Sequence, residues 1–239
     1  MPVSSRRALC AFAAAVAVAG FATPASADDA RSSALQFTVA DYAPRIDDQF
    51  SSSPGPYEQV FGNDGSLMFE VGWEGHILDD VGALTAGLSI GYWSVEGSAI
   101  LQSGSTGADT TKLQMLPISG QLSYRFDMFA EQYFPLAPIV RLGVDYYLWR
   151  VLDGSDEVAS FSAGNEAQGA TYGWHGTIGV HVLLDFFAPD MAIAFERNAG
   201  VYNTFLIAEY RYSQIDEFGS ATSFRLGDDS FVFGLALEL

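Results

Sequence analysis

The sequence predicts an all-β protein, an up-and-down antiparallel transmembrane β-barrel of about eight strands. Three observations lead to this fold class. Apolar and polar residues alternate with a period of two in eight segments. The connecting segments alternate between long and short, as in outer-membrane barrels. No run of eighteen or more apolar residues follows residue 27, so the sequence offers no transmembrane helix.

Residues 1–27 are predicted to be a secretory signal peptide. Arg6 and Arg7 precede an apolar, alanine-rich stretch, and a small-x-small cleavage site places the cut before Asp28. The apolar stretch is too short for a stable membrane span. We therefore expect an exported protein.

The expected mature domain is residues 28–239. Cys10 is the only cysteine and leaves with the signal peptide, so we expect neither disulfides nor thiol chemistry. The chain is 49% hydrophobic and 14% aromatic, which excludes a disordered tail protein. Its 29 acidic and 11 basic residues give a formal net charge of −18, which argues against nucleic acid as a partner.

Eight segments carry the alternation, and several approach the nine to eleven residues that a tilted strand needs to cross a bilayer. Their apolar positions, in chain order, are Leu35, Phe37 and Val39; Leu67, Phe69, Val71, Trp73 and Ile77; Leu84, Ala86, Leu88, Ile90 and Tyr92; Ile118, Gly120, Leu122, Tyr124 and Phe126; Val140, Leu142, Val144, Tyr146 and Leu148; Tyr172, Trp174, Ile178, Val180, Val182 and Leu184; Leu206, Ala208, Tyr210 and Tyr212; and Phe231, Phe233, Leu235, Leu237 and Leu239. The first segment is the weakest, and the sequence leaves open whether it pairs with the last to close the barrel.

The connectors predict which end of the barrel faces outward. They are residues 43–66, 79–83, 97–111, 127–136, 151–169, 188–200 and 213–228. Long connectors are expected outside and short ones in the periplasm, with both ends of the barrel domain on the periplasmic side. Pro189 and Gly200 bracket one or two predicted helical turns, which we interpret as a capped turn.

The charged face of the strands is predicted to line the lumen, because an arginine or lysine at the bilayer midplane costs roughly 2 to 4 kcal/mol. This set comprises Glu70, Glu74, His76, Arg125, Arg141, Asp145, His175, His181, Glu209 and Arg211, with Glu238 as a further candidate. An eight-stranded barrel is just wide enough to be filled by its own side chains, and buried charges must be paired. We expect a structural network of ion pairs, without a cofactor or a metal.

Tyrosines and tryptophans near the strand ends are predicted to form two girdles at the membrane interfaces. The set is Tyr92, Trp93, Tyr124, Tyr146, Tyr147, Trp149, Tyr172, Trp174, Tyr210 and Tyr212.

Three stretches carry a resemblance to a known family. They are YAPRID (42–47) with GPYE (55–58) and FG (61–62); PLAP (135–138) with GVDYYLW (143–149); and GVYNTFL (200–206). Together they resemble a family of predicted outer-membrane β-barrel proteins found chiefly in myxobacteria and related bacteria, and more broadly the small OmpA/OmpX-like barrels. The resemblance implies a location and a fold but no established activity. The last segment also looks like the signal read by the barrel assembly machinery, although it ends in Leu239, where an aromatic residue is usual.

Catalytic residues are not expected. His175 and His181 lie six residues apart on one strand, about 20 Å at roughly 3.3 Å per residue, so they cannot share a site. His76 with Glu70 and Glu74 is a candidate metal site or dyad, and its partners on neighbouring strands cannot be read from the sequence. The chain carries no motif of a serine hydrolase, a zinc protease or a phosphate-binding loop.

The sequence therefore predicts a monomeric outer-membrane barrel with a packed polar lumen and a structural or surface-interaction role. Its longest loops, 43–66 and 151–169, are expected to meet the outside. Outer-membrane lipid, lipopolysaccharide and the assembly machinery are the expected partners. Three alternatives stay open: a lipid-modifying enzyme, a narrow pore or small-ligand carrier, and a soluble lipocalin-like barrel with its apolar face inward.

Overall fold

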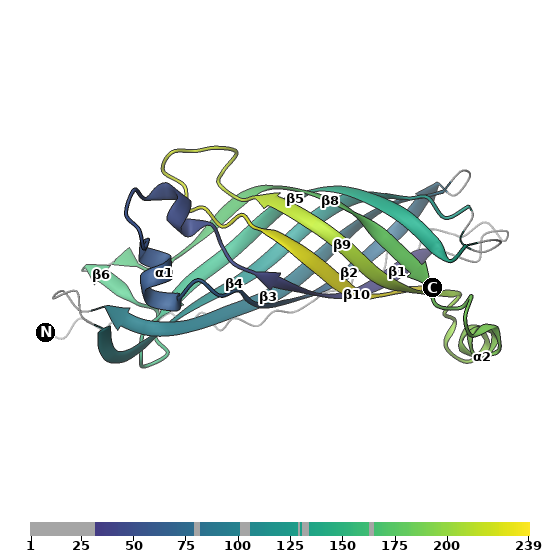
Figure 1. Cartoon of the computed structure of the whole chain (residues 1–239), viewed down its shortest axis with the longest axis horizontal. Coiled ribbons are helices and arrows are strands. Elements are labelled where there is room, and N and C mark those ends of the chain that lie inside the picture. Colours follow the sequence, from purple (N-terminus) through teal and green to yellow (C-terminus); the bar gives the residue numbers. More distant parts are fainter. Residues whose placement is uncertain (1–31, 79–81, 101–105, 129, 131–133, 163–164) are drawn as a thin grey trace, which may run out of the picture.

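The computed structural model describes residues 32–239 except 79–81, 101–105, 129, 131–133 and 163–164. Within these residues, eight antiparallel strands close one barrel in the order β1-β10-β9-β8-β5-β4-β3-β2 (Figure 1). The strands are β1 (Ser33–Tyr42), β2 (Ser66–Leu78), β3 (Ala83–Ile100), β4 (Thr106–Arg125), β5 (Leu136–Leu152), β8 (Gln168–Leu183), β9 (Asn203–Gln214) and β10 (Asp229–Glu238). The predicted fold class is confirmed. The predicted signal peptide lies outside the described residues.

The first and last strands close the barrel. β1 pairs with β10 in an antiparallel register that places Leu35 opposite Leu237 and Val39 opposite Phe233. On its other side β1 pairs with β2. Every barrel strand therefore has two hydrogen-bonded neighbours, and the ring of strands has no open edge.

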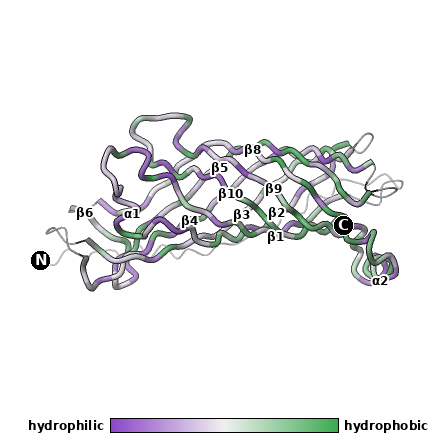
Figure 2. The backbone as a smooth tube through the Cα atoms, in the orientation of Figure 1, coloured by the Kyte–Doolittle hydropathy of each residue, from purple (hydrophilic) through white to green (hydrophobic). Residues whose placement is uncertain are grey.

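The predicted alternation determines which side chains face outward. In β2 the side chains of Phe69 and Trp73 are exposed, whereas Glu70 and Glu74 are buried inside the barrel. Over the part of the barrel nearer α2 the other strands follow the same rule, and hydrophobic residues recur along the wall in Figure 2. The result is an apolar belt around the outside of the barrel.

One end of the barrel carries helix α2 (Pro189–Ala199), which connects β8 to β9, together with the start of β1 and the end of β10 (Figure 1). Pro189 occupies the first turn of α2, and Gly200 ends the helix in the left-handed conformation with φ of 68°. The predicted helix is confirmed, but its 11 residues make about three turns rather than one or two. None of the helices in the described part of the chain is long and apolar enough to span a membrane.

The opposite end carries the short 3₁₀-helix η1 (Ile46–Gln49), helix α1 (Pro56–Phe61) and a small hairpin of β6 (Ser160–Ser162) and β7 (Asn165–Glu166). These elements lie in the two connections that were predicted to be the longest.

Two predicted connectors, 97–111 and 188–200, are wrong in their extent, whereas 151–169 agrees with the structure to within two residues at each end. The predicted loop 97–111 is largely strand, because β3 continues to Ile100 and β4 begins at Thr106. In the predicted loop 151–169, strand β5 reaches Leu152 and β8 begins at Gln168. The connection between β8 and β9 is longer than the predicted short turn, so lengths do not alternate regularly along the chain.

The ends of β3 and β4 were missed because the apolar residues change phase there. Odd-numbered residues of β4 face inward along the described strand, and toward the α2 end they are polar, as at Ser119 and Ser123. Toward the other end the inward residues are Leu113 and Met115, both 1% exposed. The barrel is therefore apolar outside over one part of its length and apolar inside over the remainder.

Candidate functional site: the charged lumen and its apolar cap

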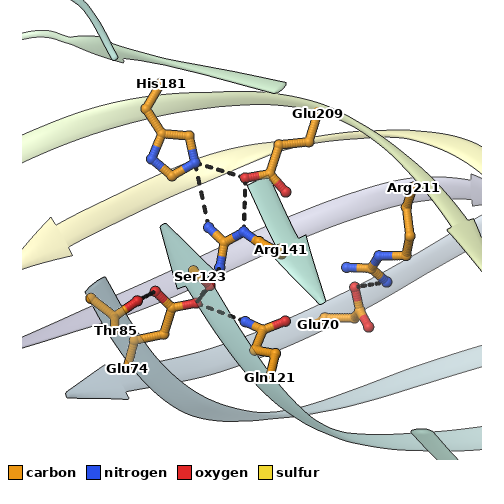
Figure 3. Close-up of polar contacts among 9 residues, drawn as sticks. All are labelled: Glu70, Glu74, Thr85, Gln121, Ser123, Arg141, His181, Glu209 and Arg211. Carbon is orange, nitrogen blue, oxygen red and sulfur yellow. Dashed lines mark hydrogen bonds and ion pairs between the residues drawn. The ribbon is translucent and has the colours of Figure 1, made fainter. Parts of the chain in front are cut away.

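Arg141 of β5 is the centre of the lumen. Its Nη1 donates to Oε1 of Glu74 on β2, and its Nε donates to Glu209 of β9 over 3.1 Å (Figure 3). All three side chains are buried. His181 of β8 completes the group, with Nε2 2.7 Å from Glu209 Oε1 and 3.4 Å from Arg141 Nη2. One guanidinium thus compensates two carboxylates that come from opposite parts of the sheet.

Glu74 is fully supplied with hydrogen bonds. Thr85 Oγ1 donates to Oε2 over 2.8 Å, and Gln121 Nε2 and Ser123 Oγ donate to Oε1 over 2.7 Å and 2.9 Å (Figure 3). Donors from β3 and β4 therefore replace the water that this carboxylate loses on burial.

A second group lies between this centre and the η1/α1 end. Arg211 Nη1 lies 2.7 Å from Glu70 Oε2. Asp145 faces His175 Nδ1, with both carboxylate oxygens 2.9 Å from that nitrogen, and accepts a hydrogen bond from Ser119 Oγ over 2.5 Å. This group again pairs each buried carboxylate with a donor.

A third group lies at the α2 end. Arg125 pairs with Glu238 and lies 3.1 Å from Asp127, and its guanidinium stacks over the ring of Phe205 at 4.3 Å. His76 Nε2 is 3.7 Å from Glu238 Oε1. Glu238 also accepts a hydrogen bond from Asn203 over 2.7 Å.

The three groups together form what we call the lumen network. It holds the ten residues named from the sequence and Glu238, but it divides them in a way that the sequence did not predict. His175 and His181 belong to different groups, as expected from their separation. His76 lies against Glu238, while Glu70 and Glu74 pair with Arg211 and Arg141, so the candidate dyad of His76 with these acids is not assembled. Among the described residues, no group of three or more His, Cys, Asp or Glu could hold a metal ion.

The geometry of Ser119, Asp145 and His175 is not that of an activated nucleophile. A catalytic serine must give its proton to the imidazole. Here Ser119 Oγ and His175 Nδ1 both contact the same carboxylate of Asp145. Gly143 leaves room for the imidazole ring, since a Cβ there would lie 2.7 Å from His175 Nε2. The arrangement supplies the buried carboxylate of Asp145 with polar partners.

An apolar cluster fills the barrel above the lumen network at the η1/α1 end, and we call it the apolar cap. Its residues are Tyr42, Ile46, Tyr57, Met68, Trp93, Leu113, Met115, Tyr147, Ile215 and Leu226. Trp93 is completely buried, donates from Nε1 to the carbonyl oxygen of Ser66 over 3.0 Å, and meets the Tyr42 ring edge-on at 5.2 Å. The Tyr42 hydroxyl donates to the carbonyl oxygen of Leu226.

The prediction that Trp93, Tyr147 and Trp149 belong to an outer girdle is wrong. All three occupy odd-numbered, inward-facing positions of β3 and β5. Trp93 and Tyr147 are buried in the apolar cap, and Trp149 packs against it and donates from Nε1 to Thr171 Oγ1 over 3.3 Å. Tyr92, Tyr172 and Tyr212 do face outward. The sequence did carry a signal for this. In β3 and β4 the apolar residues switch from the outward-facing positions to the inward-facing ones.

The segment between β1 and β2 covers the apolar cap. Asp47 of η1 accepts hydrogen bonds from the backbone N–H groups of Tyr57 and Glu58, over 2.7 Å and 2.8 Å, and so caps the first turn of α1. Arg45 pairs with Asp229 at the start of β10 and lies over the Tyr212 ring at 5.1 Å. These contacts fasten the segment to the rim of the barrel.

Asp228, in the connection between β9 and β10, makes stability depend on pH. Burial raises the pKa of its carboxyl from 3.8 to about 6, and backbone hydrogen bonds from Asp229 and Ala43 oppose this shift. Oδ2 has no hydrogen-bond partner among the described residues. A raised pKa in the folded protein means that the stability contributed by Asp228 is complete below pH 4 and is lost as the pH rises through about 6.

We therefore expect Asp228→Asn to be more favourable at pH 8 than at pH 4. The difference in unfolding free energy between variant and wild type should rise by on the order of 2 kcal/mol between these pH values. Urea unfolding of both proteins in the same detergent measures this difference. The contributions of the other titrating groups to the unfolding free energy are common to both proteins and cancel. An equal difference at the two pH values would show that Asp228 has an ordinary pKa.

Comparisons with known proteins leave the chain without an assigned family. No protein-family model matches it, and no curated protein matches its sequence. It is similar to solved structures of neisserial surface protein A, NspA (13% identity, TM-score 0.48, covering 88% of this chain and 98% of that chain), and of the outer membrane protein OprG from Pseudomonas aeruginosa (10% identity, TM-score 0.48, 87% and 96%). A third is Ail, the attachment invasion locus protein of Yersinia pestis (10% identity, TM-score 0.40, 87% and 97%).

At these identities and TM-scores the likeness supports no conclusion about function. The fold rests on the strand pairing described above, and the resemblance to a myxobacterial family stays a prediction.

Proposed function

We propose that the protein is an integral outer-membrane β-barrel, exported with a cleaved signal peptide, that has a structural or surface-interaction role and no open channel. The observation that carries the proposal is the inverted polarity of the barrel. Large apolar side chains face outward, as at Leu142 (67% exposed) and Ile178 (63%), while the lumen network is buried. In water this surface would be an aggregation liability, whereas a bilayer covers it.

The length of the apolar belt supports a membrane span. In β5 the outward apolar residues extend from Pro138 to Leu148, eleven residues, which matches the roughly nine to eleven that a tilted strand needs. In the described strands, charged residues return to the outer face toward the η1/α1 end, at Asp41, Glu96, Lys112, Arg150 and Asp229. Beyond that level the apolar cap gives the barrel an interior of the kind found in proteins surrounded by water.

The filled interior favours a role other than transport. A pore or a small-ligand carrier needs an unfilled lumen, but here paired charges occupy the centre and the apolar cap lies above them. The inverted polarity also argues against a lipocalin-like carrier, and the Ser119 geometry argues against a lipid-modifying hydrolase.

What the barrel presents to the exterior is the folded segment with η1 and α1 and the β6–β7 hairpin. We propose that these contact lipopolysaccharide or another surface partner, and that the barrel is a monomer inserted by the barrel assembly machinery.

Conductance in planar lipid bilayers tests the closed lumen. We expect purified protein to insert without producing discrete conductance steps, because the buried side chains of the apolar cap pack together inside the barrel at that level. Insertion must be verified independently by resistance of the barrel to added protease. Reproducible single-channel steps from inserted protein would overturn the proposed role and favour the narrow pore.

A further inference from the structure

Helix α2 lies across the barrel axis at the end opposite the apolar cap. Figure 1 shows the helix almost end-on while the barrel axis runs across the picture, and the helix lies outside the outline of the barrel. No residue of α2 is buried. The helix therefore does not close the lumen from below, and it presents its side chains to whatever surrounds the end of the wall.

One face of α2 and the turn before it are apolar and uncovered. Met191 and Phe195 lie one turn apart on the same face and are 74% and 48% exposed. Phe186 and Phe187, which precede the helix, are 46% and 66% exposed and meet edge-on at 5.5 Å. At 100° per residue, Arg197 lies on the opposite face from Phe195. Ile193, which is 47% exposed, lies on the Arg197 side of the helix. The concentrated apolar surface is therefore that of Met191 and Phe195 together with Phe186 and Phe187.

This apolar surface continues the apolar belt of the barrel. Phe186 and Phe187 follow β8 after Leu183, and Val182 pairs with Leu206 one step before Leu183 and Phe205, the last β8–β9 pair at this rim. Leu206 is itself 44% exposed on the outer face. Thr204 donates its backbone N–H to Asp185 over 3.0 Å, which fixes the turn to the rim. The belt and the helix can therefore meet one continuous apolar phase.

We propose that α2, with Phe186 and Phe187, lies in the plane of the membrane at the boundary between headgroups and acyl chains of the periplasmic leaflet. This inference rests on the proposed membrane span. An amphipathic helix in this orientation inserts its apolar face by about 5 to 10 Å. The charged residues of α2, Asp190, Glu196 and Arg197, sum to −1, so the partner is phospholipid recognised through its apolar region and not through an anionic headgroup.

Quenching by brominated lipid tests the orientation of α2. In a Cys10→Ser background, three single-cysteine variants are prepared: Met191→Cys on the apolar face, Arg197→Cys as the matched control on the polar face, and Leu142→Cys in the middle of the belt. All three positions are exposed, so the fold tolerates the changes. Each is labelled with an environment-sensitive fluorophore and reconstituted in zwitterionic phosphatidylcholine vesicles. These contain lipid brominated near the top of the acyl chain for positions 191 and 197, and lipid brominated near the chain end for position 142.

We expect the label at Met191→Cys to be quenched at least about twofold more strongly than the label at Arg197→Cys, with clear quenching at Leu142→Cys. Equal, weak quenching at positions 191 and 197, with quenching at 142, would overturn the inference and leave the membrane span intact. Absence of quenching at 142 would overturn the membrane span itself and the inference with it.

Discussion

Replacing Arg141 with methionine should lower the free energy of unfolding by about 3 to 5 kcal/mol, the effect expected when one partner of a buried ion pair is removed. Arg141 contacts both Glu74 and Glu209, and all three side chains are at least 95% buried. Methionine fills a similar volume, so the loss comes from two uncompensated carboxylates and not from a cavity. Urea unfolding in detergent, followed by tryptophan fluorescence, measures the change.

Two further variants identify the cause. Arg197→Met makes the same substitution on exposed α2 and should leave stability within about 0.5 kcal/mol of wild type. Adding Glu74→Gln and Glu209→Gln to Arg141→Met should recover most of the loss, because neutral amides do not need the guanidinium. A loss below about 1 kcal/mol for Arg141→Met would contradict a lumen held together by paired charges.

Replacing Trp93 with alanine should cost about 3 to 5 kcal/mol, because it opens a cavity in the apolar cap. The Trp93 side chain is completely buried and packs on Tyr42, and its indole N–H satisfies the carbonyl of Ser66. The substitution removes the packing and leaves that carbonyl without its donor. The same urea titration measures the effect.

The neighbouring residue provides the control for the apolar cap. Tyr92 precedes Trp93 but faces outward and is 49% exposed. Tyr92→Ala leaves no enclosed cavity and should cost about 1 kcal/mol or less. Similar losses for Tyr92→Ala and Trp93→Ala would mean that the two positions are equally exposed, which contradicts an inward-facing apolar cap.

The barrel and the facing of its residues could be predicted from the sequence because both follow from a single periodicity. Once Glu70, Arg141 and Glu209 occupy one parity of their strands, the cost of charge in lipid assigns that parity to the lumen. The helix between β8 and β9 was predictable for a different reason. Pro189 and Gly200 start and end a helix through their own backbone preferences, which do not depend on distant contacts.

The pairing within the lumen could not be predicted, because it depends on contacts across the barrel. Arg141 meets Glu74 only after β2, β3, β4 and β5 have taken their registers, and the sequence gives no register. The apolar cap was missed for a different reason. Trp93 and Met115 occupy inward-facing positions, as the charged residues of the lumen do, but they are apolar. The alternation of outward apolar and inward polar residues, by which the strands were recognised, therefore breaks down at this end.

Electrophoretic mobility of unboiled and boiled protein, recovered from the outer-membrane fraction, tests the membrane-inserted barrel most directly. A closed barrel that is stable in detergent should migrate differently before and after boiling, and the protein should be found in that fraction. Protein that appears in the soluble periplasm and shows no mobility shift would contradict a membrane-inserted barrel, because lipid would then not be what contacts the apolar belt.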